Sequence, residues 1–370
     1  MTRFTPCSPE ELVECLRDAA ASGKRIRLDG NNSKSRLGGP IPEADVHIST
    51  AALNQVLIFE PRDLTISVGA GLPYARFTEL LDENGMMVPM DPPFAAQATV
   101  GGVVAANSSG PRRRLYGTPR DVVIGMRFAT LEGKLVQSGG MVVKNVAGLD
   151  MAKLLIGSLG TLAAIATVNF KLMPKPHGTR TFVSEFNSVA EAIAQRDRIL
   201  QSTLQPAAVD LLNPAAAGGK QWTLAVAVAG NEAVLRRYRE ELPGDMLEGE
   251  AENRYWHPIR EFTPNFLNAV PEGCVIRVSV TLDAVGATMA KLPGKAIARA
   301  ANGVCYAHVE TPAPELLNSH RAILEYGPAS RTVSTPMWPV KDSGYPIMQK
   351  IKRMFDPDHL LNRGRFYGDI

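Results

Sequence analysis

The stretch of sequence that decides the fold reads Ala98-Thr99-Val100-Gly101-Gly102-Val103-Val104-Ala105-Ala106-Asn107-Ser108-Ser109-Gly110. Small residues dominate it. A glycine pair followed by Asn-Ser-Ser-Gly lets backbone N–H groups face a ligand with no side chain between them. The pattern indicates a segment that binds a large, flat, phosphate-bearing cofactor. The alternative is a buried packing turn rich in glycine and alanine, and we favour the binding segment.

A second loop, directly after an expected strand, reads Leu28-Asp29-Gly30-Asn31-Asn32-Ser33-Lys34-Ser35-Arg36-Leu37-Gly38-Gly39. Consecutive N–H groups, helped by Ser33 and Ser35, could surround a diphosphate. Asparagine tolerates positive φ better than other non-glycine residues, so the loop can fold without more glycines. The Asp29 carboxylate opposes a dianion unless Lys34 or Arg36 offsets it. Taken alone, the segment is equally consistent with a polar turn.

Three further motifs follow in order, and they are Tyr116-Gly117-Thr118-Pro119-Arg120-Asp121, Gly157-Ser158-Leu159-Gly160-Thr161-Leu162 and Phe355-Asp356-Pro357-Asp358-His359-Leu360-Leu361-Asn362-Arg363-Gly364-Arg365. In order and spacing they resemble the FAD-binding domain of the vanillyl-alcohol oxidase and p-cresol methylhydroxylase (PCMH) flavoprotein family. The resemblance covers residues 1–175 and 346–370. Three positions depart from the family pattern, namely Leu159 for Glu, Ala163 for Gly and Arg363 for Pro. The short length and segment 144–155 are most similar to the small FAD-binding subunits of bacterial glycolate oxidases.

The resemblance implies an α+β fold with a two-subdomain, PCMH-type FAD-binding domain at 1–175. It also implies a cap domain at 176–340 and a C-terminal arm at 341–370 that returns to the FAD domain. The residues expected to contact FAD are Gly30, Asn31, Asn32, Ser33, Lys34, Ser35, Ala98, Thr99, Gly101, Gly102, Asn107, Ser108, Gly110, Gly160, Thr161, Ile165, Asn362 and Arg365. Family members that tether the flavin use a His or Cys in these loops, and neither occurs between His47 and His177. We therefore expect non-covalent FAD.

The order of elements in the cap supports the same architecture. We expect helices at 8–22, 73–84 and 151–156 in the first domain and at 345–354 in the arm, with short strands at 25–28, 46–48, 56–59 and 64–68. The region 181–250 reads as strand, helix, strand, strand, helix, strand, which matches a ferredoxin-like unit. Its expected elements are 181–186, 189–200, 207–212, 222–228, 232–241 and 246–250. Further strands are expected at 274–281 and 304–309, and a helix at 314–325.

Other classes of protein are disfavoured. A net charge of +3 over 370 residues gives no reason to expect a nucleic-acid partner, and we expect the basic run 112–114 to form a solvated loop or a subunit contact. Gly69-Ala70-Gly71 follows a strand, but Tyr74 stands where a dinucleotide-binding motif needs its third glycine. No apolar run approaches the ~18 residues of a membrane span, and no signal-peptide core is evident. The default location is the cytoplasm.

The sequence identifies no catalytic residue. The catalytic relatives carry a histidine cluster, often with metal, in the cap, whereas His308 on an expected strand has no second histidine nearby. A lone strand histidine is more often a hydrogen-bonded core or surface residue, so no metal site is expected. Arg277, Arg321 and Arg331 could bind a carboxylate. The four cysteines, Cys7, Cys15, Cys274 and Cys305, are too dispersed for an iron–sulfur cluster.

The resemblance implies an FAD-binding subunit of a glycolate (2-hydroxy acid) oxidase or dehydrogenase complex. Its implied partners are a larger catalytic FAD subunit and an iron–sulfur subunit that passes electrons to membrane quinones, so membrane contact is peripheral and through the partners. Two alternatives remain. One is a self-sufficient small oxidase of the same family, and the other is a scaffold subunit that performs no chemistry.

Overall fold

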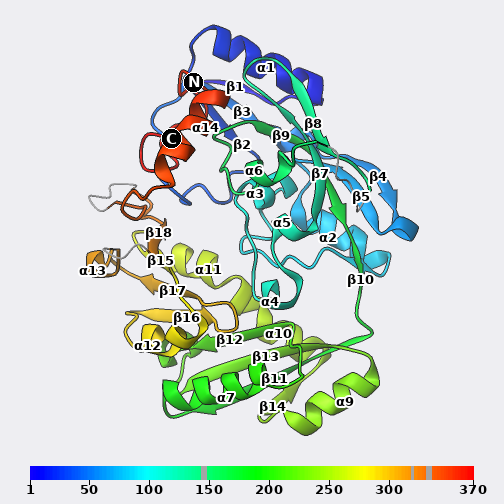
Figure 1. The fold of residues 1–370 in the computed structure, drawn as a ribbon, viewed down its shortest axis with the longest axis vertical. Helices are drawn as coiled ribbons and strands as arrows, with labels where there is room; N and C mark the ends of the chain where they lie inside the picture. Colours follow the sequence, from blue (N-terminus) through cyan, green and yellow to red (C-terminus); the bar gives the residue numbers. More distant parts are fainter. Residues whose placement is uncertain (143–147, 318–320, 331–335) are drawn as a thin grey trace.

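The computed structural model describes residues 1–142, 148–317, 321–330 and 336–370. The segment 144–147 and Arg331, which the sequence analysis singled out, lie outside the described residues. Figure 1 shows two domains, with the N-terminal domain above and the cap below. The C-terminal helix lies against the N-terminal domain, far along the chain from the strands it contacts (Figure 1).

The N-terminal domain is built around two sheets. A three-stranded parallel sheet has the order β1-β3-β2, and a five-stranded antiparallel sheet has the order β4-β5-β9-β7-β8. Its strands are β1 (Thr2–Phe4), β2 (Ile26–Asp29), β3 (Val46–Ser49), β4 (Val56–Glu60), β5 (Thr65–Gly69), β6 (Met86–Met87), β7 (Val123–Ala129), β8 (Leu135–Gly139), β9 (Ala164–Lys171) and β10 (Met173–Pro174). Its helices are α1 (Pro9–Ala21), α2 (Tyr74–Glu83), α3 (Val100–Ala105), α4 (Arg113–Tyr116), α5 (Pro119–Val122) and α6 (Ala152–Leu155).

Local sequence explains where these helices begin. The Ser8 hydroxyl accepts the Glu11 N–H at 3.1 Å at the start of α1, which buries Leu12 and Leu16. Thr99 caps α3 in the same way, accepting the Gly102 N–H at 3.2 Å. The helices expected at 8–22, 73–84 and 151–156 and the four early strands are confirmed.

The cap contains two ferredoxin-like units where the sequence indicated one. Its eight-stranded antiparallel sheet has the order β14-β11-β13-β12-β16-β17-β15-β18. In chain order each half is a strand, helix, strand, strand, helix and strand, and the halves meet where β12 pairs with β16. The elements are β11 (Gly178–Phe186), α7 (Val189–Gln201), β12 (Ala208–Leu212), α8 (Pro214–Ala217), β13 (Trp222–Gly230), α9 (Glu232–Glu241), β14 (Asp245–Leu247), α10 (Gly249–Arg260), α11 (Phe262–Ala269), β15 (Cys274–Ser279), α12 (Val285–Met289), β16 (Lys295–Arg299), β17 (Val304–Val309), α13 (Pro314–Leu317) and β18 (Ala322–Tyr326).

Two expectations for the cap were wrong in detail. The expected helix at 314–325 ends at Leu317, and Ala322–Tyr326 is instead strand β18, with burial that alternates along it as a half-buried strand requires. The expected strand at 246–250 stops at Leu247 because α10 begins at Gly249. Helices α10 and α11 were not foreseen. They connect the two units and lie between the cap sheet and the N-terminal domain (Figure 1).

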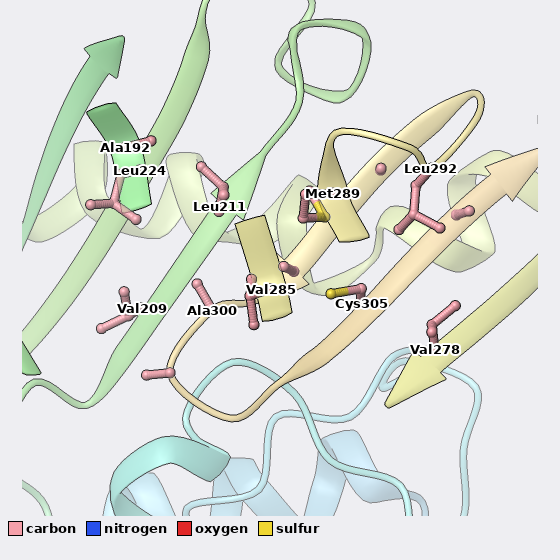
Figure 2. Close-up of a cluster of buried hydrophobic side chains, with 14 of the residues drawn as sticks. Ala192, Val209, Leu211, Leu224, Val278, Val285, Met289, Leu292, Ala300 and Cys305 are labelled. Carbon is pink, nitrogen blue, oxygen red and sulfur yellow. The ribbon is translucent and has the colours of Figure 1, made fainter. Parts of the chain in front are cut away.

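The cap's main core lies between the sheet and helices α7, α9 and α12. Figure 2 shows how side chains from both units, including Leu211, Leu224, Val278 and Met289, meet there. A smaller cluster on the other face of the sheet packs Trp256 of α10 against Ala208, Ala225 and Ile297, among others. The sheet is therefore covered on both faces, and α10 is fixed by its apolar side.

The C-terminal arm returns to the N-terminal domain, as expected. Helix α14 (Tyr345–Phe355) buries Lys352, whose ammonium donates to the Thr161 carbonyl at 2.8 Å and to the Asp356 carboxylate at 2.6 Å. Beyond the helix, Leu361 pairs in parallel with Ile26 of β2. The Asn362 side chain accepts the Leu28 N–H at 2.8 Å and donates to the Leu28 carbonyl at 3.0 Å. The α+β fold with its returning arm is confirmed.

Candidate cofactor site

The first cofactor loop leaves β2 at Asp29 and is shaped by close backbone approach. A Cβ atom on Gly30 would lie 2.2 Å from the Thr99 hydroxyl, so only glycine fits there. Asn32 adopts the positive φ of 53° that the sequence analysis anticipated for an asparagine. Among the described residues, no hydrogen bond is recorded for the backbone N–H groups of residues 31–34. The loop therefore presents free donors next to the start of α3.

Lys34 supplies a positive charge to this loop. Its ammonium nitrogen is buried, has no hydrogen-bond partner among the described residues and lies 5.6 Å from the centre of the Phe94 ring. Burial lowers the pKa of Lys34 to about 8, and the nearby Glu261 carboxylate opposes that shift. A buried cation without a partner is costly unless an anion binds it, and a diphosphate would supply that anion.

The Asp29 carboxylate is neutralised, but not by the residues that the sequence suggested. It lies 3.3 Å from Arg27 and 3.0 Å from the His47 ring. Arg36, proposed to offset it, instead donates to the cap carbonyls of Gly327, Leu267 and Gly273. Because Arg36 belongs to the loop and these carbonyls to the cap, the loop is tied directly to the cap.

Two cavities meet at this loop. The first is lined by residues of both glycine-rich segments, including Gly30, Lys34 and Thr99. The second is a 280 Å³ cleft between the N-terminal domain and the cap. Both are lined by Leu37, Ala106 and Leu159, so they adjoin each other across these residues. Leu159 adopts a φ of 52°, a conformation that costs a non-glycine residue ~1–2 kcal/mol. This residue lines both cavities, so its strained backbone lies at the site itself.

The cleft is rich in arginine. Arg113 enters from α4, Arg260 from the end of α10, Arg277 from β15 and Arg299 from β16. Arg299 is ion-paired with the buried Asp210 of β12, and Arg277 lies 3.3 Å from Glu325. Burial raises the pKa of Asp210 to about 6 and also raises the pKa of Glu325, although the neighbouring arginines oppose both shifts. The cleft therefore suits an anionic ligand.

His308 lies in the cleft wall but is not free to act as a base. Its Nδ1 lies 3.1 Å from the Lys295 carbonyl, so Nδ1 carries the proton, and Nε2 accepts from the Thr263 hydroxyl at 3.0 Å. The rings of Phe262 and Phe266 pack edge-on against it. Burial lowers its pKa to about 3, so it is neutral at physiological pH. His308 is thus a hydrogen-bonded residue of the cleft wall, and the described residues hold no group of three or more potential metal ligands.

Comparison with known proteins agrees with this geometry. Residues 3–139 match the FAD binding domain family, and residues 339–366 match the C-terminal domain of FAD linked oxidases. The chain is 28% identical to glycolate oxidase subunit GlcE of Escherichia coli (strain K12), over 98% of each chain. The chain therefore contains an FAD binding domain and, near its C-terminus, a segment of the C-terminal domain of FAD linked oxidases. It is also 30% identical to glycolate oxidase subunit GlcD of Bacillus subtilis (strain 168), covering 57% of this chain but only 45% of that relative.

A solved structure with a different named activity has the same fold. An alkyldihydroxyacetonephosphate synthase superposes with a TM-score of 0.69 at 18% identity, covering 97% of this chain and 75% of the synthase. That similarity concerns the fold alone. The cofactor of this chain is FAD, and the free N–H groups of residues 31–34 and the buried Lys34 ammonium fit its diphosphate.

The residues expected to contact FAD fall into two groups. One group lines the two cavities: Gly30, Asn31, Asn32, Ser33, Lys34, Thr99, Gly102, Asn107, Ser108 and Arg365. Ser35 lies on the outer side of the loop, in a neighbouring hollow. The other group lines neither main cavity: Ala98, Gly101, Gly110, Gly160, Thr161, Ile165 and Asn362.

The second group shapes the walls instead. A Cβ on Gly101 would lie 2.7 Å from that of Ala70, and one on Gly110 would lie 1.9 Å from the Asp91 carbonyl. Gly160 makes room for the Asn362 amide, and Ile165 is buried in the core. These residues position the cofactor segments of the chain through packing.

Sequence reasoning missed most of the cap's contribution. Arg260, Arg299, Tyr306 and Glu325 come from separate elements and form no motif along the chain. Arg113 was expected in a solvated loop or subunit contact, but it lines the cleft, and its neighbour Arg112 lies 3.4 Å from the buried Asp91. The available signal was the run of three arginines in a loop that follows a cofactor segment.

The state of Lys34 predicts how FAD binding depends on pH. Its pKa is lowered from an ordinary 10.5 to about 8, so without FAD the ammonium loses its proton as the pH rises through that value. The diphosphate binds the protonated form, and FAD affinity should therefore fall by up to about tenfold per pH unit above 8. Fluorescence titrations with FAD across this range measure the effect. In Lys34→Met the slope should vanish, and an unchanged slope in that variant would contradict the assignment.

The FAD should be bound without a covalent link. The described residues that line the two cavities include no cysteine, and both ring nitrogens of His308, the histidine among them, are engaged. Precipitation of the holoprotein with acid should release the flavin into the supernatant. Yellow colour retained in a washed pellet would show a covalent bond.

Proposed function

We propose that this chain is the FAD-binding subunit of a glycolate oxidase or dehydrogenase complex that oxidises a small 2-hydroxy acid. The observation that carries the proposal is that the cavity at the cofactor loop adjoins the arginine-lined cleft, which would hold an acidic substrate beside the cofactor. Similarity along 98% of its length to a protein named glycolate oxidase subunit GlcE supports the assignment to such a complex.

The residues divide this work between them. Lys34 and the N–H groups of residues 31–34 would hold the diphosphate, and Asn107 and Ser108 line the passage toward the cleft. The cleft arginines would bind and orient the substrate carboxylate. When bound, FAD supplies a hydride acceptor for the carbon that carries the hydroxyl group. Two contacts hold the cap against the N-terminal domain: Arg36 donates to the Gly327 carbonyl, and Glu261 accepts the Phe94 and Ala95 N–H groups. The cap held in this way would exclude water from the cleft.

Neither His308 nor Glu325 in the cleft is free to act as the base that removes the hydroxyl proton. His308 is neutral but engaged at both nitrogens, and Glu325 is paired with Arg277. We therefore propose that turnover depends on a larger catalytic FAD subunit. The four cysteines of this chain are free and widely spaced in the sequence, so they do not form an iron–sulfur motif. Electrons would therefore leave through a separate iron–sulfur subunit. No helix among the described residues is long and apolar enough to cross a bilayer, and we propose a cytoplasmic complex that meets the membrane through its partners.

An absorption spectrum of the purified chain before and after anaerobic glycolate tests the proposal. We expect a flavin band that glycolate leaves unchanged until the larger subunit is added. Bleaching of the lone chain by glycolate would show a self-sufficient oxidase. A chain that binds no flavin even with added FAD would be a scaffold, and the proposed function would fail.

A further inference from the structure

The cleft contains more positive charge than one carboxylate requires. Of its four arginines, Arg299 is paired with Asp210 and Arg277 with Glu325. Arg113 and Arg260 have no carboxylate within ion-pair distance and no side-chain hydrogen bond among the described residues. The described ion pairs therefore leave Arg113 and Arg260 without a direct ion-pair partner, although Glu325 acts on Arg113, and Asp91, Glu252 and Glu261 act on Arg260, from longer range.

These two arginines approach the cleft from different domains. Arg113 stands on α4 of the N-terminal domain, and Arg260 ends α10 of the cap. Arg260 is held in place because its helix packs against the cap sheet through Trp256 and Ile259. Burial lowers the pKa of Arg260, which records the cost of its poorly solvated charge, yet a guanidinium remains protonated. An anion bound in the cleft would pair with this guanidinium more closely than the carboxylates of Asp91, Glu252 and Glu261 do.

We propose that the cleft binds a 2-hydroxy acid with a second acidic group, one carboxylate on Arg113 and the other on Arg260. The proposal rests on the proposed function, because it takes the cleft to be the hydroxy-acid site, and it extends the ligands of that site from glycolate to 2-hydroxy dicarboxylates. Two carboxylates match the two unpaired guanidinium groups, whereas glycolate would leave one of them without a partner. The diphosphate of FAD is accounted for separately by Lys34 in the adjoining cavity.

The contribution of the second carboxylate to binding can be measured by comparing glycolate with 2-hydroxy dicarboxylates. Tartronate is glycolate with one added carboxylate, and malate and 2-hydroxyglutarate place that carboxylate progressively further away. Each is titrated into the FAD-loaded chain by calorimetry, with glycolate as the reference. We expect at least one dicarboxylate to bind about 10- to 100-fold more tightly than glycolate, the gain expected of one charge-assisted pair.

Variants assign the charges. Arg113→Gln and Arg260→Gln should each reduce the best dicarboxylate to the affinity of glycolate, while both retain FAD. The control is Arg254→Gln, because Arg254 lies on the same helix as Arg260 but is exposed and should change neither affinity. Equal affinity for glycolate and all three dicarboxylates would overturn the proposal. So would loss of FAD rather than of hydroxy acid in the variants, which would assign these arginines to the cofactor. A wild-type chain that does not bind FAD would instead contradict the proposed function.

Discussion

Replacing Lys352 with methionine should destabilise the folded chain by about 3–5 kcal/mol, the range for a buried ion pair that loses one member. Lys352 and Asp356 are both 0% exposed, and the Lys352 ammonium also donates to the carbonyls of Thr161 and Leu361 at 2.8 and 2.9 Å. Methionine fills similar space but leaves a carboxylate and two carbonyl groups buried without that donor. Because Asp356 also accepts the Leu360 and Leu361 N–H groups, the turn that joins β2 should loosen as well.

Equilibrium unfolding in urea measures this effect. Lys350→Met is the matched control, since Lys350 is exposed on the same helix and its loss should change the free energy of unfolding by less than about 0.5 kcal/mol. If Lys352→Met unfolds at the same urea concentration as the control, the pair does not hold the arm in place.

Lys34→Met should weaken FAD binding by about 10- to 100-fold, because it removes a charge-assisted contact to the diphosphate. The same change should leave the stability of the FAD-free chain unaltered or increase it. The ammonium is buried without a partner, so the wild-type chain already bears the cost of desolvating it. Lower affinity together with undiminished stability distinguishes a ligand-binding lysine from a structural one.

Fluorescence titration with FAD and thermal unfolding of the FAD-free chain provide the two readouts. Lys24→Met removes the same charge from an exposed position before β2 and serves as the control. Wild-type affinity in Lys34→Met, or a loss of stability comparable to that of Lys352→Met, would contradict the role assigned to Lys34.

The sequence was informative where backbone geometry restricts residue choice. Asn32 and Gly30 were expected in a tight loop for the reasons that the structure shows. A glycine in the sequence does not tell whether the backbone approaches a ligand or another part of the protein, because both contacts require the absence of a side chain. Gly101 and Gly110 were expected to contact FAD, but they allow close contact with Ala70 and Asp91.

The cap was harder to predict because its information is not local. Strands β16 and β18 have five residues each, too short for a periodicity to be decisive. The second ferredoxin-like unit becomes visible only when strand pairing is known. The cleft arginines lie on separate elements, and only the assembled sheet and helix α10 bring Arg260 and Arg299 to one cavity.

The two hydrogen bonds between the Asn362 side chain and the Leu28 backbone join residues that are 334 positions apart in the sequence. As the chain leaves the ribosome, β2 and the loop after it therefore emerge long before the residues that secure them. The cap can complete its own sheet first, while the FAD site must wait for the C-terminal arm. Loading of FAD would then require that synthesis has passed Asn362, because a chain that stops before it lacks the hydrogen bonds that fix the start of the cofactor loop.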